Sequence, residues 1–196
     1  MSLKTKIEEP FTVAGTISNK ILIFDIDDTL IYSNATINVM KDGKVVKVLT
    51  SAEYNDYIKK DGEYFDFSNF DSLLLLRDAN MTPYWETLKR EYEKGTHIAI
   101  LTARSRPIMI KKFFLEKGID IKDDLIFCCG YSKFPWKGTI QYKKTKVIEY
   151  LTLLGYNTLV FFDDNLYNLE MAKQLEDLYQ SIKIITVHAK LINIKK

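Results

Sequence analysis

Ile21-Leu22-Ile23-Phe24-Asp25-Ile26-Asp27-Asp28-Thr29-Leu30 is the stretch of sequence that decides the fold. Its first four residues are apolar, which is typical of a short buried strand, and an acidic pair, Asp25 and Asp27, follows at once. In open α/β sheets, ligands bind beyond the carboxyl ends of the parallel strands. A carboxylate at that place can act as a nucleophile or as an oxygen ligand of a divalent cation. The same residues also fit an Asx turn that closes the strand, because Asp often caps turns.

The composition indicates a single domain with a modest insertion. The chain has 196 residues, of which 46% are hydrophobic, enough for a substantial core. Its 28 basic and 26 acidic residues nearly balance, unlike the basic excess of a dedicated nucleic-acid binder. No apolar run approaches the roughly 18 residues of a membrane span, and the N-terminus lacks a signal-peptide pattern. We therefore expect a cytoplasmic protein with no membrane partner.

The two cysteines are adjacent, at Cys128 and Cys129. Because neighbours on a strand point to opposite faces, we expect one of them in the core and no disulfide framework. This pattern favours a reducing cytoplasm.

A block of about residues 32–80 interrupts the strand–helix alternation. Two short β-type runs, residues 36–40 and 45–49, flank an Asp-Gly pair, which is a strong hairpin signal. A helix over residues 51–59 and a strand or aromatic-anchored loop over residues 63–70 are expected to follow, and then an apolar run at residues 73–76. We interpret the block as a small accessory lobe near the site, inserted into a core formed by residues 20–31 and 81–190.

Strands then alternate with helices of about 10–15 residues, which predicts a parallel sheet with helices on both faces. The polar residues before position 19 are expected to form a flexible or edge-lying lead-in. The strands are expected at residues 21–24, 97–101, 125–129, 158–162 and 183–187. The helices are expected at residues 82–94, 106–117, about 144–154 and about 166–178.

Reactive polar residues follow three of these strands, and the carboxyl ends of parallel strands share one edge of the sheet. Like charges about 4 Å apart cost about 4 kcal/mol at an effective dielectric constant of 20. Four carboxylates in one site therefore favour a bound Mg²⁺, which prefers carboxylate oxygens and often bridges to a phosphate. A hydroxyl, an Arg and a Lys from the helix after the third strand would complete a positive wall. The residues concerned are Asp25, Asp27, Thr102, Arg104, Asp163 and Asp164.

Four segments together resemble, in order, the four motifs of the haloacid dehalogenase superfamily. They are Asp25-x-Asp27-x-Thr29-Leu30, Ile100-Leu101-Thr102-Ala103-Arg104, Lys143-Lys144-Thr145-Lys146 and Phe161-Phe162-Asp163-Asp164. The resemblance covers roughly residues 21–187. It implies a Rossmann-like, three-layer doubly wound core and phosphoryl transfer through an aspartyl-phosphate. It also implies that the block at residues 32–80 is a small type-1 cap, which usually leaves the site open to larger substrates.

The resemblance also implies a role for each motif residue. Asp25 resembles the nucleophile, and Asp27 resembles the general acid, whose backbone carbonyl would also contact Mg²⁺. Thr102 resembles the hydroxyl that binds the phosphoryl oxygens, and Asp163 with Asp164 resembles the metal-holding pair.

Three lysines, Lys143, Lys144 and Lys146, are candidates for the third motif. We favour Lys144, because Val147, Ile148 and Leu151 then follow it on the apolar face of the helix. The remaining motif residues Thr29, Ala103 and Arg104 are candidate substrate contacts, with a surface salt bridge as the plain alternative for Arg104.

The leading function hypothesis is a Mg²⁺-dependent phosphomonoesterase acting on a phosphorylated small molecule or nucleotide. The second is a polynucleotide 3′-phosphatase, because the Thr102-Ala103-Arg104 motif and the small cap are similar to phage-type nucleic-acid repair phosphatases. The mixed lysines and aromatics of residues 133–146 fit single-stranded nucleic acid, although a solvated face with aromatic anchors explains them better. No kinase P-loop is present in the sequence.

Two hypotheses come from outside the phosphatases. A phospho-acceptor domain resembling a receiver is disfavoured because its acceptor Asp would follow the third strand, where Cys128 and Cys129 stand. A non-catalytic binding domain is disfavoured because all four motifs are intact.

Overall fold

The computed structural model describes residues 19–190, and the predicted lead-in lies outside this range. Its centre is a five-stranded sheet in the order β10-β9-β1-β7-β8, in which every neighbouring pair is parallel. The strands are β10 Lys183–His188, β9 Thr158–Asp163, β1 Lys20–Phe24, β7 His97–Thr102 and β8 Ile126–Cys128. The predicted parallel sheet is confirmed. Because β1 lies between β7 and β9, the three strands that end in reactive residues are direct neighbours.

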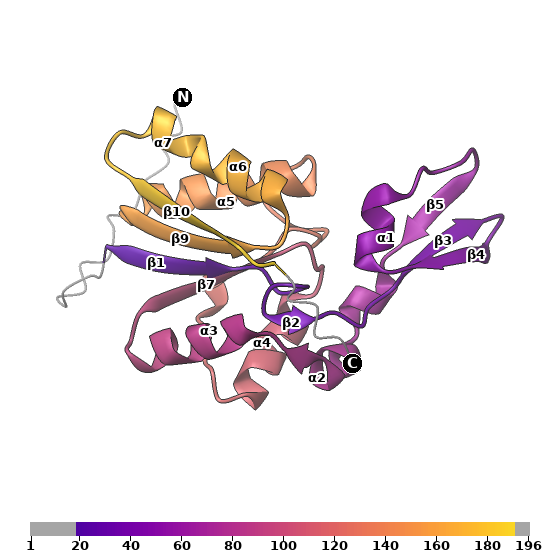
Figure 1. The fold of residues 1–196 in the computed structure, drawn as a ribbon, viewed down its shortest axis with the longest axis horizontal. Helices are drawn as coiled ribbons and strands as arrows, with labels where there is room; N and C mark the ends of the chain where they lie inside the picture. The colour runs from indigo at the N-terminus through magenta and orange to yellow at the C-terminus, as the bar shows by residue number, and fades with distance from the viewer. Residues whose placement is uncertain (1–18, 191–196) are drawn as a thin grey trace, which may run out of the picture.

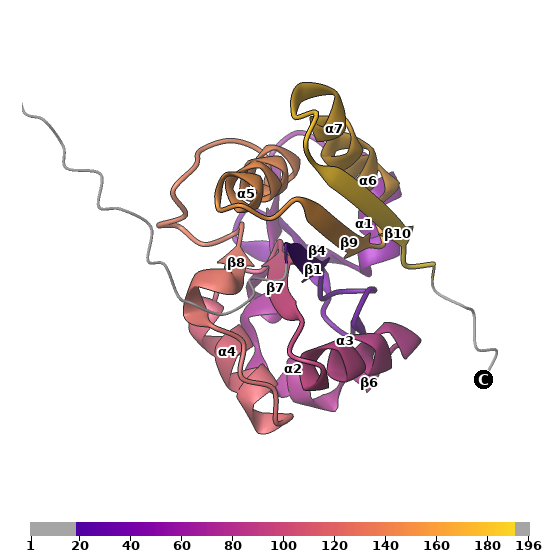
Figure 2. The same cartoon turned by 90° about the vertical axis from the view of Figure 1, so that its left-hand side faces the viewer.

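Helices cover both faces of the sheet, so the fold is a three-layer, Rossmann-like α/β fold (Figure 2). Helices α3 Pro83–Glu93 and α4 Pro107–Glu116 lie on one face. Helices α5 Ile140–Leu153, α6 Leu166–Lys173 and α7 Leu175–Leu178 lie on the other. None of the helices between residues 19 and 190 combines the length and the apolar character that a bilayer crossing requires.

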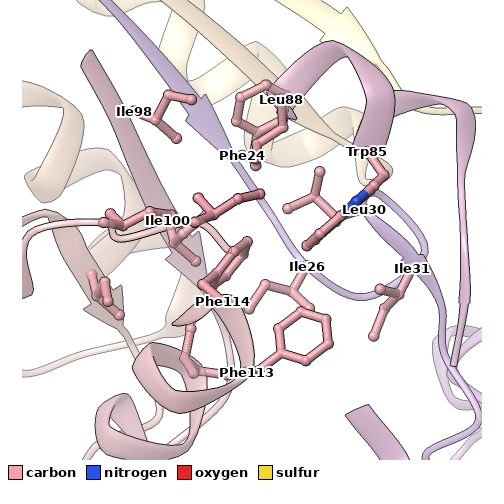
Figure 3. Close-up of a cluster of buried hydrophobic side chains, with 14 of the residues drawn as sticks. Phe24, Ile26, Leu30, Ile31, Trp85, Leu88, Ile98, Ile100, Phe113 and Phe114 are labelled. Carbon is pink, nitrogen blue, oxygen red and sulfur yellow. The ribbon is translucent and has the colours of Figure 1, made fainter. Parts of the chain in front are cut away.

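The hydrophobic core has two halves because successive strand residues point to opposite faces. Leu22 and Phe24 of β1 pack with α3 and α4, and Figure 3 shows Phe24 in this cluster. Ile21 and Ile23 pack under α5 and α6. The same alternation corrects our expectation for the cysteines. Cys128 and Cys129 are both buried, one in each half, because helices cover both faces of the sheet.

Two predicted helices have different bounds in the structure. Helix α5 begins at Ile140 instead of about Lys144, because the Thr139 side chain caps it by accepting a hydrogen bond from the Tyr142 amide at 3.2 Å. The helix expected over residues 166–178 is divided into α6 and α7. Lys173 and Glu176, on either side of the break, both bind the backbone of Ile184 in β10.

The block at residues 32–80 leaves the core through a short antiparallel pair, β2 Ile31–Tyr32 with β6 Asn80–Met81. It contains a separate antiparallel sheet in the order β4-β3-β5, and Figure 1 shows this sheet beyond the carboxyl ends of the core strands. Its elements are β3 Ile37–Lys41, β4 Lys44–Leu49, α1 Ser51–Asp56, β5 Glu63–Asp66, the 3₁₀ helix η1 Ser68–Asp71 and α2 Leu73–Asp78.

The predicted hairpin in this block is confirmed. Asp42 and Gly43 both have positive φ, 50° and 71°, as a two-residue type I′ turn requires. Helix α1 ends three residues earlier than expected, at Asp56. The cause is Tyr57, which leaves the helix so that its ring meets Phe65 at 6.1 Å and its hydroxyl donates to Glu63 at 3.0 Å.

Candidate active site

The loop after β1 holds the first acidic residues in place. The amides of Leu30 and Ile31 donate to the Ile26 carbonyl at 2.9 and 3.1 Å, while Ile26 and Leu30 insert into the hydrophobic cluster (Figure 3). Asp28 takes a positive φ of 57° at the bend, which Asp tolerates better than most residues. Asp25 is therefore fixed at the end of the central strand, its amide bonded to the Phe162 carbonyl of β9 at 3.0 Å.

Lys144 joins two of the acidic residues. Its Nζ donates to Asp25 Oδ1 at 3.0 Å and to Asp163 Oδ2 at 2.7 Å, and all three side chains are buried. Burial acts to lower the pKa of Lys144, but the charges of Asp163 and Asp25 outweigh it and hold this pKa above its usual value.

The two other candidate lysines bind elsewhere. Lys143 donates to the Cys129 carbonyl at 2.8 Å, and Lys146 pairs with Glu149 at 2.6 Å. Of the three lysines, Lys144 alone contacts Asp25 and Asp163, because it shares the buried face of α5 with Val147 and Ile148.

Three carboxylates lie close together: Asp25, Asp163 and Asp164 offer oxygens within 4.8 Å of one another. Burial raises the pKa of Asp25 well above its ordinary value, with Lys144 opposing the shift and Asp163 adding to it. Burial, and next the charge of Asp163, raise the pKa of Asp164 to about 7. Crowded, desolvated carboxylates of this kind suit a divalent cation with oxygen ligands, so the cluster is compatible with metal binding.

Two asparagines fix the orientation of Asp163. Its Oδ1 accepts hydrogen bonds from the Asn165 amide and from Asn168 Nδ2, both at 2.9 Å. Asn165 also caps α6, accepting from the Tyr167 amide at 3.0 Å. Asn168 was missed by the sequence analysis. The available signal was a polar residue on the face of α6 that buries Leu169 and Ala172.

Asp27 is not one of the three clustered carboxylates and pairs with Arg104. Arg104 Nε donates to Asp27 Oδ2 at 2.8 Å and Nη2 donates to Oδ1 at 2.6 Å, while Ser33 Oγ donates to Oδ1 at 2.7 Å. The third guanidinium nitrogen, Nη1, donates to the Phe70 carbonyl. Arg104 is only 3% exposed. It does form a salt bridge, but the bridge is buried, so the alternative of a surface salt bridge is wrong. No sequence pattern marks Ser33 as a partner of Asp27.

The other motif residues have distinct surroundings. Thr102 is buried, and its Oγ1 accepts from the Arg104 amide at 3.3 Å. Thr29 is also buried, and its carbonyl accepts from the Thr82 hydroxyl. Its own Oγ1 has no hydrogen-bond partner among the described residues. Ala103 lines the cavity beside the carboxylates, together with Arg104. Thr29 and Thr102 do not line this cavity.

The cavity has a volume of about 650 Å³. Asp25, Lys144 and Asp164 line it from the core, and the insertion contributes Phe67 and Phe70 among others. Both rings belong to the predicted strand or aromatic-anchored loop over residues 63–70, and the sequence pattern placed that lobe near the site without assigning its rings to the cavity.

Comparison with known proteins leaves the family open. No family model matches the chain, and no curated protein matches it. Among solved structures, it is similar to the hypothetical protein PH1952 from Pyrococcus horikoshii OT3, with 15% identity and a TM-score of 0.29. The match covers 85% of this chain and 40% of that one. The fold and the site by themselves define a doubly wound α/β protein with a largely buried carboxylate cluster.

Proposed function

We propose that this protein is a Mg²⁺-dependent phosphomonoesterase that acts through a phosphorylated Asp25, as its resemblance to the haloacid dehalogenase superfamily implies. The observation that best supports this proposal is the meeting of Asp25, Asp163 and Asp164 within 4.8 Å at the ends of neighbouring strands. These residues are far apart in the sequence. A buried carboxylate nucleophile needs compensating positive charge, and Lys144 supplies part of it.

The chemistry assigned to the residues of this chain has two steps. An oxygen of Asp25 forms a bond to phosphorus while the bond to the leaving oxygen breaks, and Asp27 donates a proton so that a neutral alcohol departs. Asp27 then takes a proton from water, whose oxygen bonds to phosphorus as the bond to Asp25 breaks. One water is consumed, and alcohol and inorganic phosphate leave.

Mg²⁺ held by Asp25, Asp163 and Asp164 would supply charge neutralisation for the carboxylates and the phosphoryl oxygens. Lys144 places a fixed ammonium beside the nucleophile, where charge on the transferring group can be stabilised. Asn165 and Asn168 keep Asp163 oriented.

The pairing of Asp27 with Arg104 constrains its proposed acid role. Both Asp27 oxygens accept hydrogen bonds from Arg104, and Oδ1 also accepts one from Ser33. A proton on either oxygen competes with one of these donors. Asp27 therefore acts as an acid only when the contact with Arg104 loosens during turnover.

The test is hydrolysis of a panel of phosphate esters with and without Mg²⁺, by the wild type and by Asp25→Asn. We expect Mg²⁺-dependent phosphate release that Asp25→Asn abolishes without loss of folding. Asp123→Asn is a matched control, because this carboxylate is 87% exposed and remote from the cluster. Hydrolysis that survives in Asp25→Asn would overturn the proposal. A phosphorylated protein that accumulates and releases no phosphate would favour the phospho-acceptor hypothesis instead.

A further inference from the structure

We infer that the substrate carries an aromatic ring on its leaving group, as a nucleoside monophosphate does, and that Phe67 and Phe70 of the insertion hold this ring. This inference deepens the proposed function and rests on it. It concerns the wall of the cavity opposite the carboxylates. This wall belongs to the insertion, which Figure 1 shows beyond the ends of the core strands.

Phe67 is an exposed aromatic residue in a fixed position. It is 45% exposed and lines the cavity. Three other rings hold it: its centroid lies 5.5 Å from Tyr54 in an edge-to-face contact at 82°, 6.1 Å from Phe65 and 6.4 Å from Phe70. A large apolar ring left open to solvent on a rigid support is a ready stacking surface for a planar ligand.

The aromatic wall is tied to the catalytic residues. Arg104, which binds Asp27, also donates to the Phe70 carbonyl and places its guanidinium carbon 5.4 Å from the centre of the Phe70 ring. In the next residue, the Ser105 hydroxyl donates to Asp71 of η1. A ring held by this wall is therefore held relative to the acid that must protonate the leaving oxygen.

The size and charge of the cavity narrow the substrate class. A volume of about 650 Å³ accommodates a ligand of nucleotide size. Within the described part of the chain, Arg104 and Lys144 are the cations that line it, and both are already ion-paired. Two carboxylates, Asp66 and Asp71, lie beside the aromatic wall. A leaving group without further phosphates fits this wall better than a polyanion.

Most of the lysines and aromatic residues within residues 133–146 have partners inside the protein. Lys143 binds the Cys129 carbonyl and lies 5.7 Å from the Phe134 ring centre, and Lys146 pairs with Glu149. Trp136 packs between the rings of Phe134 and Tyr150, at 5.7 and 6.1 Å. Lys133, Lys137 and Tyr142 are exposed, but none of them lines the cavity, so we favour a mononucleotide over a polynucleotide end.

The experiment compares adenosine 5′-monophosphate with ribose 5-phosphate, which share the leaving oxygen and differ by the base. Stacking on one aromatic side chain is worth roughly tenfold or more in binding, so we expect about tenfold higher kcat/KM for the nucleotide. Phe67→Ala should reduce this preference to within about threefold, because it lowers kcat/KM for the nucleotide more than for ribose 5-phosphate. Phe67→Tyr should retain the preference. Tyr64→Ala is the matched control, because Tyr64 is 50% exposed on the same small sheet but outside the cavity.

Equal kcat/KM for the two esters, or a preference that Phe67→Ala leaves intact, overturns this inference while the phosphatase proposal stands. Faster turnover of a 3′-phosphorylated oligonucleotide than of the 3′-mononucleotide overturns it too. If no ester of the panel is hydrolysed, the proposed function fails. The inference can then still be tested by calorimetry, which compares the binding of the two esters to Asp25→Asn. Recognition of the ring requires binding only, so the nucleotide should still bind more tightly than ribose 5-phosphate.

Discussion

Replacing Arg104 with methionine tests whether the contact with Asp27 stabilises the site. The Arg104 side chain is 1% exposed and that of Asp27 is 16% exposed. Methionine fills part of the space but removes both hydrogen bonds to Asp27 and the one to the Phe70 carbonyl. Asp27 then keeps Ser33 as its hydrogen-bond donor.

The expected cost follows from this geometry. Removing one partner of a buried ion pair typically costs about 3–5 kcal/mol of unfolding free energy. Water can partly reach Asp27, so we expect about 3 kcal/mol, at the lower end of that range. A coupling energy of about 1–3 kcal/mol should appear in a double-mutant cycle with Asp27→Asn, because the two side chains contact each other directly.

The assay is urea unfolding followed by circular dichroism for the wild type, both single variants and the double variant. Arg106→Met is the matched control: Arg106 is 64% exposed and 3.4 Å from Asp71, so its loss should cost less than about 0.5 kcal/mol. Equal costs for the two arginine variants, or additive costs for Arg104→Met and Asp27→Asn, would refute the reasoning.

Three further predictions concern the neighbouring residues. Burial raises the pKa of the Cys128 and Cys129 thiols to about 12, and since the thiolate is the reactive form, alkylation at pH 8 should be slow in the native protein and fast in urea. Fast alkylation of the native protein at pH 8 would contradict this prediction. Gly130→Ala should destabilise the fold by about 2 kcal/mol or more in urea unfolding, because a Cβ would lie 2.3 Å from the Ala103 carbonyl oxygen. An unchanged urea midpoint would mean that the loop shifts to accommodate the Cβ at little cost in free energy. Asp164→Asn should raise the melting temperature of the metal-free protein by removing a crowded charge, and calorimetry should show weaker Mg²⁺ binding; a lower melting temperature would count against charge crowding.

Local periodicity was enough to predict the parallel sheet and the buried position of Lys144 on its helix. Alternation of apolar runs and helical segments is a property of neighbouring residues, and the side of a strand or helix that is buried follows from the same pattern. Lys144 was favoured because Val147 and Ile148 mark one face of its helix, and that face is the buried one. The positions of Asp25 and Asp163 at the carboxyl ends of parallel strands likewise predicted that they would meet at one sheet edge.

The sequence by itself determined the layers, the order of the core elements and the acidic residues at the strand ends, because these depend on spacing along the chain. Only the tertiary structure decided the partners: Arg104 on Asp27, Asn168 on Asp163, and the insertion's Phe67 in the wall of the cavity. Such contacts join residues from different elements, and no periodicity within one segment records how two segments are oriented once they pack.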